Sequence, residues 1–495
     1  MNDEKYADNS AIIMAKSGSR GNVSQFSNLS GMRGLMNKSY NYSNNSKSHV
    51  IRDTIEFPIK NSLIEGVTIS EYFNSCYGTR KSMSDTAMKT SKSGYLTRKL
   101  IDSAQDVIVV EHDCGTTKGV VVSDMYNKDG MVIQTMEERI IGRYSCENVM
   151  NPTTKEIIVA TGELITKEIA SLIKQAGIKE VEVRSVIHCK CESGVCQKCF
   201  GNDLTTGKLI EKGEAVGIIA AQSIGEPATQ LNMKSKTTGG VSGAGGNIAQ
   251  GFERLKQLLD VVTPKPHEHA IISTIDGKIE QIVKHIEEEY ISIVIRNSNI
   301  PEEVVTFDAS LESVLLIKDG DTVKIGQKLT LGSVNLNELL AASGIDACRK
   351  YVINEAQEVY RLQGIDACDK YLEIIVRQMS NKLRILNSGD SKNYFIGQFI
   401  EMNVFARVNK ELISEGKNPI TAVPTIFGLD YVPSKANSFL AAASFQDSKK
   451  ILTDAAVKNQ IDNLLSIKEN VMLGNLIPAG TKFKTSEDII AEGEK

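Results

Sequence analysis

The stretch GEAVGIIAAQSIGEP, residues 213–227, decides how the central part of this chain folds. Its apolar and small residues predict a helix that breaks at Pro227 and continues over residues 228–234. A glycine-rich tip follows at residues 238–246, and residues 247–262 have the pattern of a second, amphipathic helix. Two helices joined by such a tip predict a hinged element that can fold and unfold.

Length and composition limit the class of protein. At 495 residues the chain is too long for one hydrophobic core, so we expect several domains. No window approaches about 18 apolar residues, and the polar N-terminus has no signal-peptide pattern, so neither a membrane span nor secretion is expected. The net charge of −4 argues against a uniformly basic nucleic-acid binder, and charge therefore has to be analysed segment by segment.

Residues 80–105 carry a local charge of +4, from six cations against two carboxylates. The segment is about 39 Å long if it is helical throughout. A helix this polar is typical of one that crosses open space between domains, where its cations offset phosphate charge. A solvated surface helix is the alternative interpretation. The six cations are Arg80, Lys81, Lys89, Lys92, Arg98 and Lys99.

These segments resemble the largest (β′) subunit of multisubunit, DNA-dependent RNA polymerases. Residues 213–262 resemble the trigger loop, and TAMKTSKSGYLTRKL at residues 86–100 resembles the bridge helix, which in that family spans the active-site cleft beside the nascent base pair. Residues 17–22 and 29–36 resemble the F-loop region. The resemblance implies nucleotidyl transfer from NTPs to the RNA 3′ end, in a complex with a β subunit, template DNA and RNA. A promoter-specificity subunit is a further candidate partner.

The resemblance also implies contacts to nucleic acid. Residues 430–435 replace a stretch that commonly holds Thr-Lys in the family, and Lys435 is the candidate substitute. The expected nucleic-acid-binding residues are Arg33, Arg80, Lys81, Lys89, Thr90, Lys92, Tyr95, Arg98 and Lys435.

Four of the nine cysteines lie close together in sequence, which favours metal binding in a reducing compartment over a disulfide framework. Cys196 and Cys199 form a CxxC knuckle, which alone is a moderate signal for tetrahedral zinc. The resemblance implies that Cys114, Cys189, Cys196 and Cys199 together hold one structural zinc ion. Cys191 is a spare thiol in the same loop that can compete as a ligand. Buried structural thiols are predicted at Cys76, Cys146, Cys348 and Cys368.

The motif that binds the catalytic magnesium in this family, Asn-Ala-Asp-Phe-Asp-Gly-Asp, is absent from the sequence. We therefore expect the C-terminal half of a split β′ subunit, with the magnesium-binding aspartates on a separate N-terminal β′ chain. Asp319 and Asp321 flank a glycine, and this acidic pair predicts a turn.

The trigger loop also lacks the family's usual histidine. The alignment retains Gln230 and Met233, and it places Lys234 at the usual arginine and Thr237 at the histidine. These four residues are the catalytic candidates. A threonine hydroxyl is no general acid near neutral pH, so the sequence favours positioning and charge over proton donation. An inert loop is the alternative.

The predicted fold class is α+β and multidomain. It is mainly helical, with a bridge helix, a trigger-loop hairpin and C-terminal clamp-base helices, and it adds a zinc-binding module and a small β-rich module. The expected segments are 1–70 (F-loop region), 71–113 (bridge helix), 114–210 (zinc module), 211–262 (trigger loop), 263–340 (jaw and β-rich module) and 341–495 (C-terminal clamp base and switch region).

The short trigger loop and its altered catalytic positions favour a polymerase of a giant bacteriophage, which would act in the cytoplasm of the bacterial host. A cyanobacterial or plastid split β′ subunit is the alternative, although those usually carry a large trigger-loop insertion. A non-catalytic zinc adaptor that binds nucleic acid and a structural virion protein are rivals of other classes.

Overall fold

The computed structural model describes residues 8–17, 19–21, 23–36, 57–126, 130, 132–152, 154–191, 193–234, 251–264, 268–285, 290–297, 304–311, 313–362, 364–391 and 394–480. The chain divides into two compact units, the first formed by Met1–Tyr95 with Ala228–Asn247 and the second by Leu96–Pro227 with Ile248–Lys495. The six segments expected from the sequence are a finer division than these two units, and they remain a prediction.

The first unit holds two short helices, α1 (Ser10–Lys16) and α2 (Val23–Ser30), and the beginning of the long helix α3 (Ile69–Ala104). The carboxylate of Glu71, in the first turn of α3, accepts a hydrogen bond from the backbone N–H of Thr68, the residue that precedes the helix. It also accepts one from the backbone N–H of Lys60. Capping of this kind fixes where the long helix begins.

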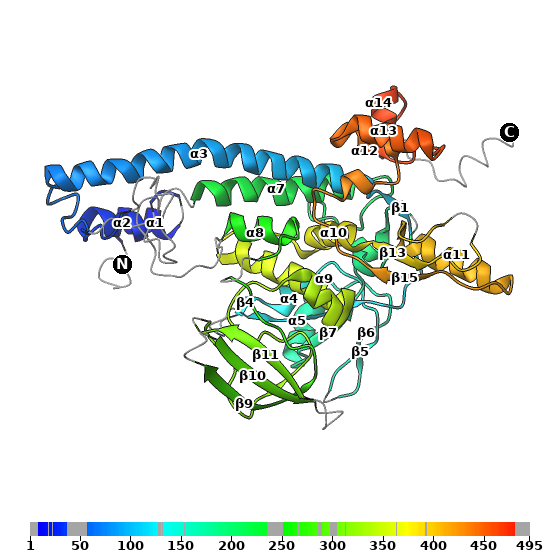
Figure 1. Cartoon of the computed structure of the whole chain (residues 1–495), viewed down its shortest axis with the longest axis horizontal. Helices are drawn as coiled ribbons and strands as arrows, with labels where there is room; N and C mark the ends of the chain where they lie inside the picture. Colours follow the sequence, from blue (N-terminus) through cyan, green and yellow to red (C-terminus); the bar gives the residue numbers. More distant parts are fainter. Residues whose placement is uncertain are drawn as a thin grey trace. The chain divides into compact units, whose positions relative to one another are not determined.

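Helix α3 runs without interruption for 36 residues (Figure 1). The helix predicted over residues 80–105 is therefore confirmed, and it begins earlier than expected. In the second unit Leu96, Leu100 and Ala104 recur at intervals of four residues and are buried, so this end of α3 is anchored by an apolar stripe.

The segment after α3 builds a small mixed module. Strand β1 (Val109–Glu111) pairs in parallel with β8 (Val195–Cys196), and β2 (Val120–Ser123) pairs antiparallel with β7 (Glu180–Val183). Two further ribbons are β3 (Met125–Tyr126) with β4 (Val132–Gln134), and β5 (Val149–Met150) with β6 (Ile157–Val159). Helices α4 (Met136–Ile140) and α5 (Lys167–Gln175) close its core, which includes Ile140, Ile165, Ile173 and Val183.

The expected β-rich module is a four-stranded antiparallel sheet in the order β11-β10-β9-β12. Its strands are β9 (Gly277–His285), β10 (Tyr290–Asn297), β11 (Val304–Ser310) and β12 (Thr322–Val323). Asp319 and Asp321 accept backbone hydrogen bonds from Ile282 and Lys318, so this acidic pair shapes a turn, as predicted.

The C-terminal third is mainly helical. Helix α9 (Leu336–Leu362) bends at Gly344, whose φ is 81°, and α10 (Asp369–Ser380) follows it. The remaining elements are β13 (Lys382–Asn387), β14 (Phe399–Glu401), α11 (Met402–Ser414), β15 (Thr421–Pro424), α12 (Phe439–Phe445), α13 (Ser448–Val457) and α14 (Ile467–Leu473). The chain is thus a mixture of helix and sheet in which helices predominate. Within its described part, no helix is both long and apolar enough to cross a membrane.

Helix α7 (Val216–Lys234) corrects one expectation, because it continues through Pro227 instead of breaking there. A proline removes one backbone hydrogen bond, and the packing of the flanking turns outweighs that loss here. The second helix, α8 (Phe252–Leu259), is shorter than the predicted 247–262. The glycine-rich tip lies outside the described residues.

Buried ion pairs join the small mixed module to α10. Arg143 donates two hydrogen bonds to Glu373, at 3.0 and 2.8 Å, and Ser185 Oγ donates to the same carboxylate at 2.7 Å. Arg139 Nε lies 2.7 Å from Asp369. Because these charges are removed from water, each depends on its partner, and the module and α10 are held in one arrangement.

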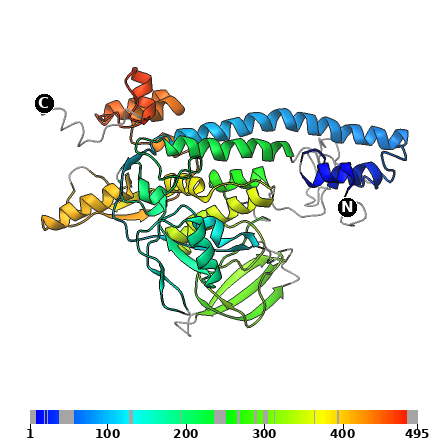
Figure 2. The same ribbon diagram turned by 180° about the vertical axis from the view of Figure 1, so that it is seen from behind.

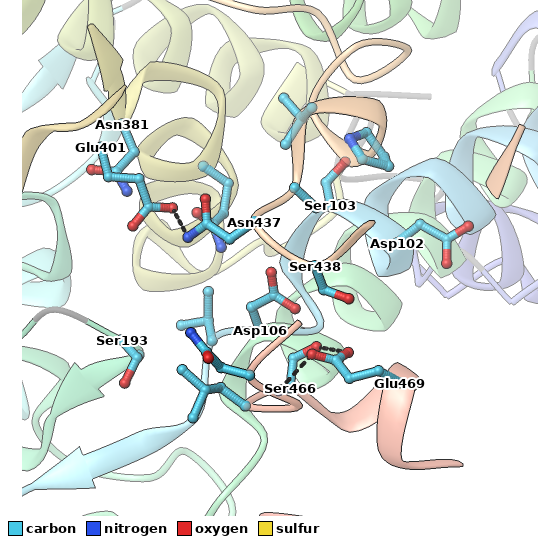
Figure 3. Close-up of a pocket in the computed structure, with 18 of the residues that line it drawn as sticks. Asp102, Ser103, Asp106, Ser193, Asn381, Glu401, Asn437, Ser438, Ser466 and Glu469 are labelled. Carbon is cyan, nitrogen blue, oxygen red and sulfur yellow. Dashed lines mark hydrogen bonds between the residues drawn. The ribbon is translucent and has the colours of Figure 1, made fainter. Parts of the chain in front are cut away.

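A cavity of about 210 Å³ lies beside the end of α3, among residues of α10, β13 and the C-terminal segments. Figure 3 shows Asp106 among the residues that line it, near Ser438 and Ser466. Asp106 Oδ1 is buried and has no hydrogen-bond partner. Burial raises the pKa of Asp106 to about 6, because the charged carboxylate is poorly solvated there.

The raised pKa of Asp106 predicts a pH-dependent loss of stability. A carboxyl that binds its proton more tightly in the folded chain stabilises the fold when protonated, and this contribution is lost as the pH rises from about 4 to about 6. We expect the unfolding free energy of the wild type, relative to Asp106→Asn, to fall by about 1–3 kcal/mol across that window and to stay level above it. Urea denaturation of both chains from pH 4 to pH 8 measures this difference. A difference that does not change with pH would contradict the assignment.

Candidate functional site

Helices α3 and α7 lie side by side where both belong to the second unit (Figures 1 and 2). A Cβ atom added at Gly217 would lie 1.8 Å from the backbone oxygen of Ala104, and one added at Gly225 would lie 2.5 Å from Thr97 Oγ1. Neither position accepts a side chain without moving a helix. The small residues of the 213–227 stretch are therefore a steric requirement of this contact.

Two buried polar contacts fix these helices further. The hydroxyl of Tyr360, on α9, donates to the backbone oxygen of Ile224 at 3.0 Å. Lys99 Nζ lies 2.5 Å from Asp260 Oδ1 and 3.1 Å from Asp430 Oδ1. Only 2% of the Lys99 side chain is exposed, so Lys99 anchors α3 and is not available to phosphate. The charge of +4 counted for residues 80–105 includes Lys99, so it overstates the positive charge that this segment exposes to solvent.

Most of the predicted nucleic-acid contacts on α3, a set that does not include Lys99, are open to solvent. Arg98 keeps 58% of its side chain exposed, although its Nε lies 3.7 Å from Asp102 and its guanidinium lies 5.9 Å from the ring centroid of Phe445. Lys89 is half-buried, and the side chain of Lys81 lies outside the described residues. The exposed members of the predicted set on α3 are Arg80, Thr90, Lys92, Tyr95 and Arg98.

The two predicted contacts outside α3 differ from each other. Arg33 is half-buried and donates to Ser75 Oγ at 3.2 Å, so part of its hydrogen-bonding capacity is used inside the first unit. Lys435 is exposed, and its Nζ lies 6.0 Å from the ring centroid of Phe399. Lys435 therefore remains open to a ligand.

The catalytic candidates lie at the end of α7 and beyond it. Gln230, Met233 and Lys234 belong to the last turns of the helix, and nothing is described of their side chains. Thr237 lies outside the described residues. Their backbone placement puts three of the four candidates on the element that packs against α3.

Five thiols gather in the small mixed module. The sulfur atoms of Cys114, Cys189, Cys191 and Cys196 all lie within 4.8 Å of one another. Cys199 falls outside this group, although its sulfur lies 3.6 Å from that of Cys114. The sequence analysis left Cys191 open as a competing ligand outside the set that the resemblance implies, and the structure places its sulfur within the group.

The local fold explains how these thiols meet. The parallel pairing of β1 with β8 brings the segment after β1, which carries Cys114, to the knuckle that begins at Cys196. Gly194 precedes the knuckle with a φ of 68°, and a Cβ atom there would lie 2.1 Å from the backbone oxygen of Ile108. Only glycine permits this approach.

The surroundings of the cluster favour a bound cation held by thiolates. Hydrogen bonds from Cys189 and the other neighbouring thiols hold the pKa of Cys114 far below its usual value, whereas hydrogen bonds with Cys114 raise the pKa of Cys191 and of Cys199. Arg184 Nη2 lies 3.5 Å from the sulfur of Cys114 and 3.4 Å from that of Cys199, and it also lies 2.7 Å from Asp113. This arginine, which the sequence did not single out, offsets the negative charge of thiolates. Four such sulfurs at this spacing fit a tetrahedral zinc ion.

The four other cysteines lie apart from this cluster. Cys348 is buried, as predicted, whereas Cys76, Cys146 and Cys368 are only partly buried.

Comparisons with known proteins show the family of the chain. Residues 66–431 match the family RNA polymerase Rpb1, domain 5, and residues 1–64 match RNA polymerase Rpb1, domain 4. The chain is 57% identical over 494 residues to the DNA-directed RNA polymerase subunit beta' of Malacoplasma penetrans, which covers 99% of the chain and 38% of that protein. The corresponding subunit of Mycoplasmoides gallisepticum is 53% identical over 99% of the chain, and that of Staphylococcus saprophyticus is 45% identical over 97%.

These relatives are bacterial, so they give no support to the expected phage origin. The chain spans 38% of the length of each of them. Because one family profile covers most of the sequence and a second covers residues 1–64, the chain belongs to the largest-subunit (Rpb1, bacterial β′) family of RNA polymerases.

Proposed function

We propose that this chain forms the C-terminal part of the β′ subunit of a DNA-directed RNA polymerase and contributes to template-directed nucleotidyl transfer from NTPs to the RNA 3′ end. The observation that carries the proposal is the packing of α7 against α3 through Gly217 and Gly225. This packing joins a long cationic helix to an element whose continuation, residues 235–250, is rich in glycine. The name shared by the relatives supports the same function.

In this proposal α3 is the bridge helix. Its exposed cations, among them Arg80, Lys92 and Arg98, offset phosphate charge, and Tyr95 offers a ring to a base. The buried Lys99 has a structural role, because its ion pairs with Asp260 and Asp430 hold the end of the helix in place. A fixed helix end allows the exposed residues to keep a constant register with the template.

Helices α7 and α8, with the residues between them, are proposed to form the trigger loop. Closure of this loop would exclude water from the incoming NTP and complete the site. Lys234 would contact the phosphates, Met233 would pack on the base, and Gln230 and Thr237 would position the nucleotide by hydrogen bonding. The proposed mechanism relies on charge and positioning because the loop sequence contains no histidine.

The catalytic magnesium is proposed to lie outside this chain. Its aspartate ligands would come from an N-terminal β′ sequence, carried by a separate chain in the split-subunit hypothesis. The β subunit, template DNA, product RNA and a promoter-specificity subunit are the other proposed partners. The expected segment boundaries, from the F-loop region at 1–70 to the C-terminal clamp base and switch region at 341–495, belong to the same proposal.

The thiol cluster is proposed to hold one zinc ion, with Cys114, Cys189, Cys196 and Cys199 as the set that the family resemblance implies. A zinc ion with four thiolate ligands has no open coordination position, so it would cross-link the loops and would not take part in catalysis. The short Cys114–Cys199 distance and the nearby Arg184 support this role.

Activity should depend on the missing aspartates. The purified chain alone should synthesise no RNA at any magnesium concentration, because it carries no aspartate triad. RNA synthesis should appear when an N-terminal β′ chain with the triad and the remaining subunits are added, as measured by primer extension. Extension by the single chain would refute the proposal, and nucleic-acid binding without extension in the full complex would favour a non-catalytic adaptor.

Lys234 should matter more than Thr237 for nucleotide addition. In the reconstituted polymerase Lys234→Ala is expected to slow single-turnover addition by about tenfold or more, which corresponds to about 1.4 kcal/mol of transition-state stabilisation. Thr237→Ala should have a smaller effect, because a neutral hydroxyl contributes only about 0.5–1.5 kcal/mol. Thr237→His tests proton donation, and we expect little gain. A large acceleration that titrates near the imidazole pKa would show that positioning is not the limiting factor.

Metal removal should unfold the small mixed module. A chelator is expected to lower the melting temperature of the chain, and added zinc should restore it, because metal binding and local folding are coupled. Differential scanning calorimetry of the full chain measures this shift, with Cys196→Ala as a variant that should resemble the chelated wild type. Unchanged melting in the chelator would count against a structural zinc.

A further inference from the structure

The cluster contains one more thiol than a tetrahedral zinc ion requires. Zinc bound by four sulfurs at about 2.3 Å places those sulfurs about 3.8 Å apart. Cys189 and Cys191 lie 3.5 Å apart, and Cys114 and Cys199 lie 3.6 Å apart, so both pairs already have nearly the spacing of two coordinated sulfurs. Cys191 thus meets the distance requirement as well as Cys199 does.

A zinc ion needs four sulfurs that all lie close to one another, and Cys191 belongs to such a group of four. The four sulfurs that lie mutually within 4.8 Å are those of Cys114, Cys189, Cys191 and Cys196, and Cys199 is not among them. The side-chain amide of Asn403 donates to the backbone oxygen of Cys191 at 2.6 Å, which holds this residue beside the cluster. Cys191 is 3% exposed, so its thiol is turned away from solvent.

We propose, on the basis of the zinc site proposed above, that zinc is held by two interchangeable ligand sets in this chain. Cys114, Cys189 and Cys196 are common to both sets, and either Cys199 or Cys191 is the fourth ligand. Exchange breaks one zinc–sulfur bond and forms another. The incoming thiol loses its proton and the departing thiolate gains one, so the net charge of the site does not change.

The polar neighbours of the two alternative ligands fit this exchange. Arg184 Nη2 donates to the sulfur of Cys199 at 3.4 Å, so a departed Cys199 thiol keeps a hydrogen-bond donor beside its sulfur. Cys191 lies 3.5 Å from Glu111 Oε2, so a departed Cys191 thiol keeps a hydrogen-bond acceptor. Each of the two residues thus has a partner when the other one is bound to the metal.

The test counts zinc and thiolate ligands in the full-length chain. Native mass spectrometry gives zinc per chain, and the sulfur-to-metal charge-transfer band of the cobalt-substituted protein reports how many thiolates bind. We expect one zinc and a four-thiolate band in the wild type, in Cys191→Ala and in Cys199→Ala. The double variant should lose the metal or bind it at least about 100-fold more weakly. Cys146→Ala removes a thiol of the same module outside the cluster and is the matched control.

Several results would overturn the proposal. Loss of zinc or a three-thiolate band in Cys199→Ala would make Cys199 the sole fourth ligand, and the same loss in Cys191→Ala would make Cys191 indispensable. Zinc retained at full affinity in the double variant would show that another group completes the site. A wild-type chain without zinc would refute the proposed metal site itself, which separates that failure from a failure of ligand exchange. Cys114→Ala shows the effect of losing a shared ligand, so misfolding is recognised as such.

Discussion

The close approach of α3 and α7 at Gly217 and Gly225 is the constraint on which the rest of the second unit depends. With Cβ atoms at these two positions, the helices would have to separate, because the nearest atoms would be the Ala104 oxygen and Thr97. The contact sets the distance between the two helices, and Tyr360 and Lys99 then fix their positions against α9 and α8. The end of a helix that runs for 36 residues is anchored in this way.

Charge has two separate uses in the molecule. Arg143 and Glu373, like Lys99 and Asp260, are buried pairs that hold elements together, and each would be costly to leave without its partner. Arg80, Lys92 and Arg98 remain exposed, where a polyanion can reach them. The net charge of −4 hides this division, since binding depends on the few cations that stay in solvent.

The metal cluster shows the same dependence on tertiary structure. Strand pairing, the turn at Gly194 and the guanidinium of Arg184 bring together thiols that are up to 85 residues apart in sequence. The CxxC spacing indicates two of these thiols, but it carries no information about Arg184 or about the position of Cys191. A residue that reaches the cluster from another part of the chain leaves no local pattern, because its contact is made by the fold.

The sequence by itself determined the helix over residues 80–105, the β-rich module and the family, since hydrophobic periodicity and long motifs are local properties of the chain. The tertiary structure alone decided that α7 continues through Pro227, that Lys99 is an anchor instead of a phosphate contact, and that Cys191 joins the thiols. Each of these outcomes depends on what packs against the residue. Propensity and spacing describe one segment at a time, whereas burial, ion pairing and metal geometry arise between segments that are distant in sequence.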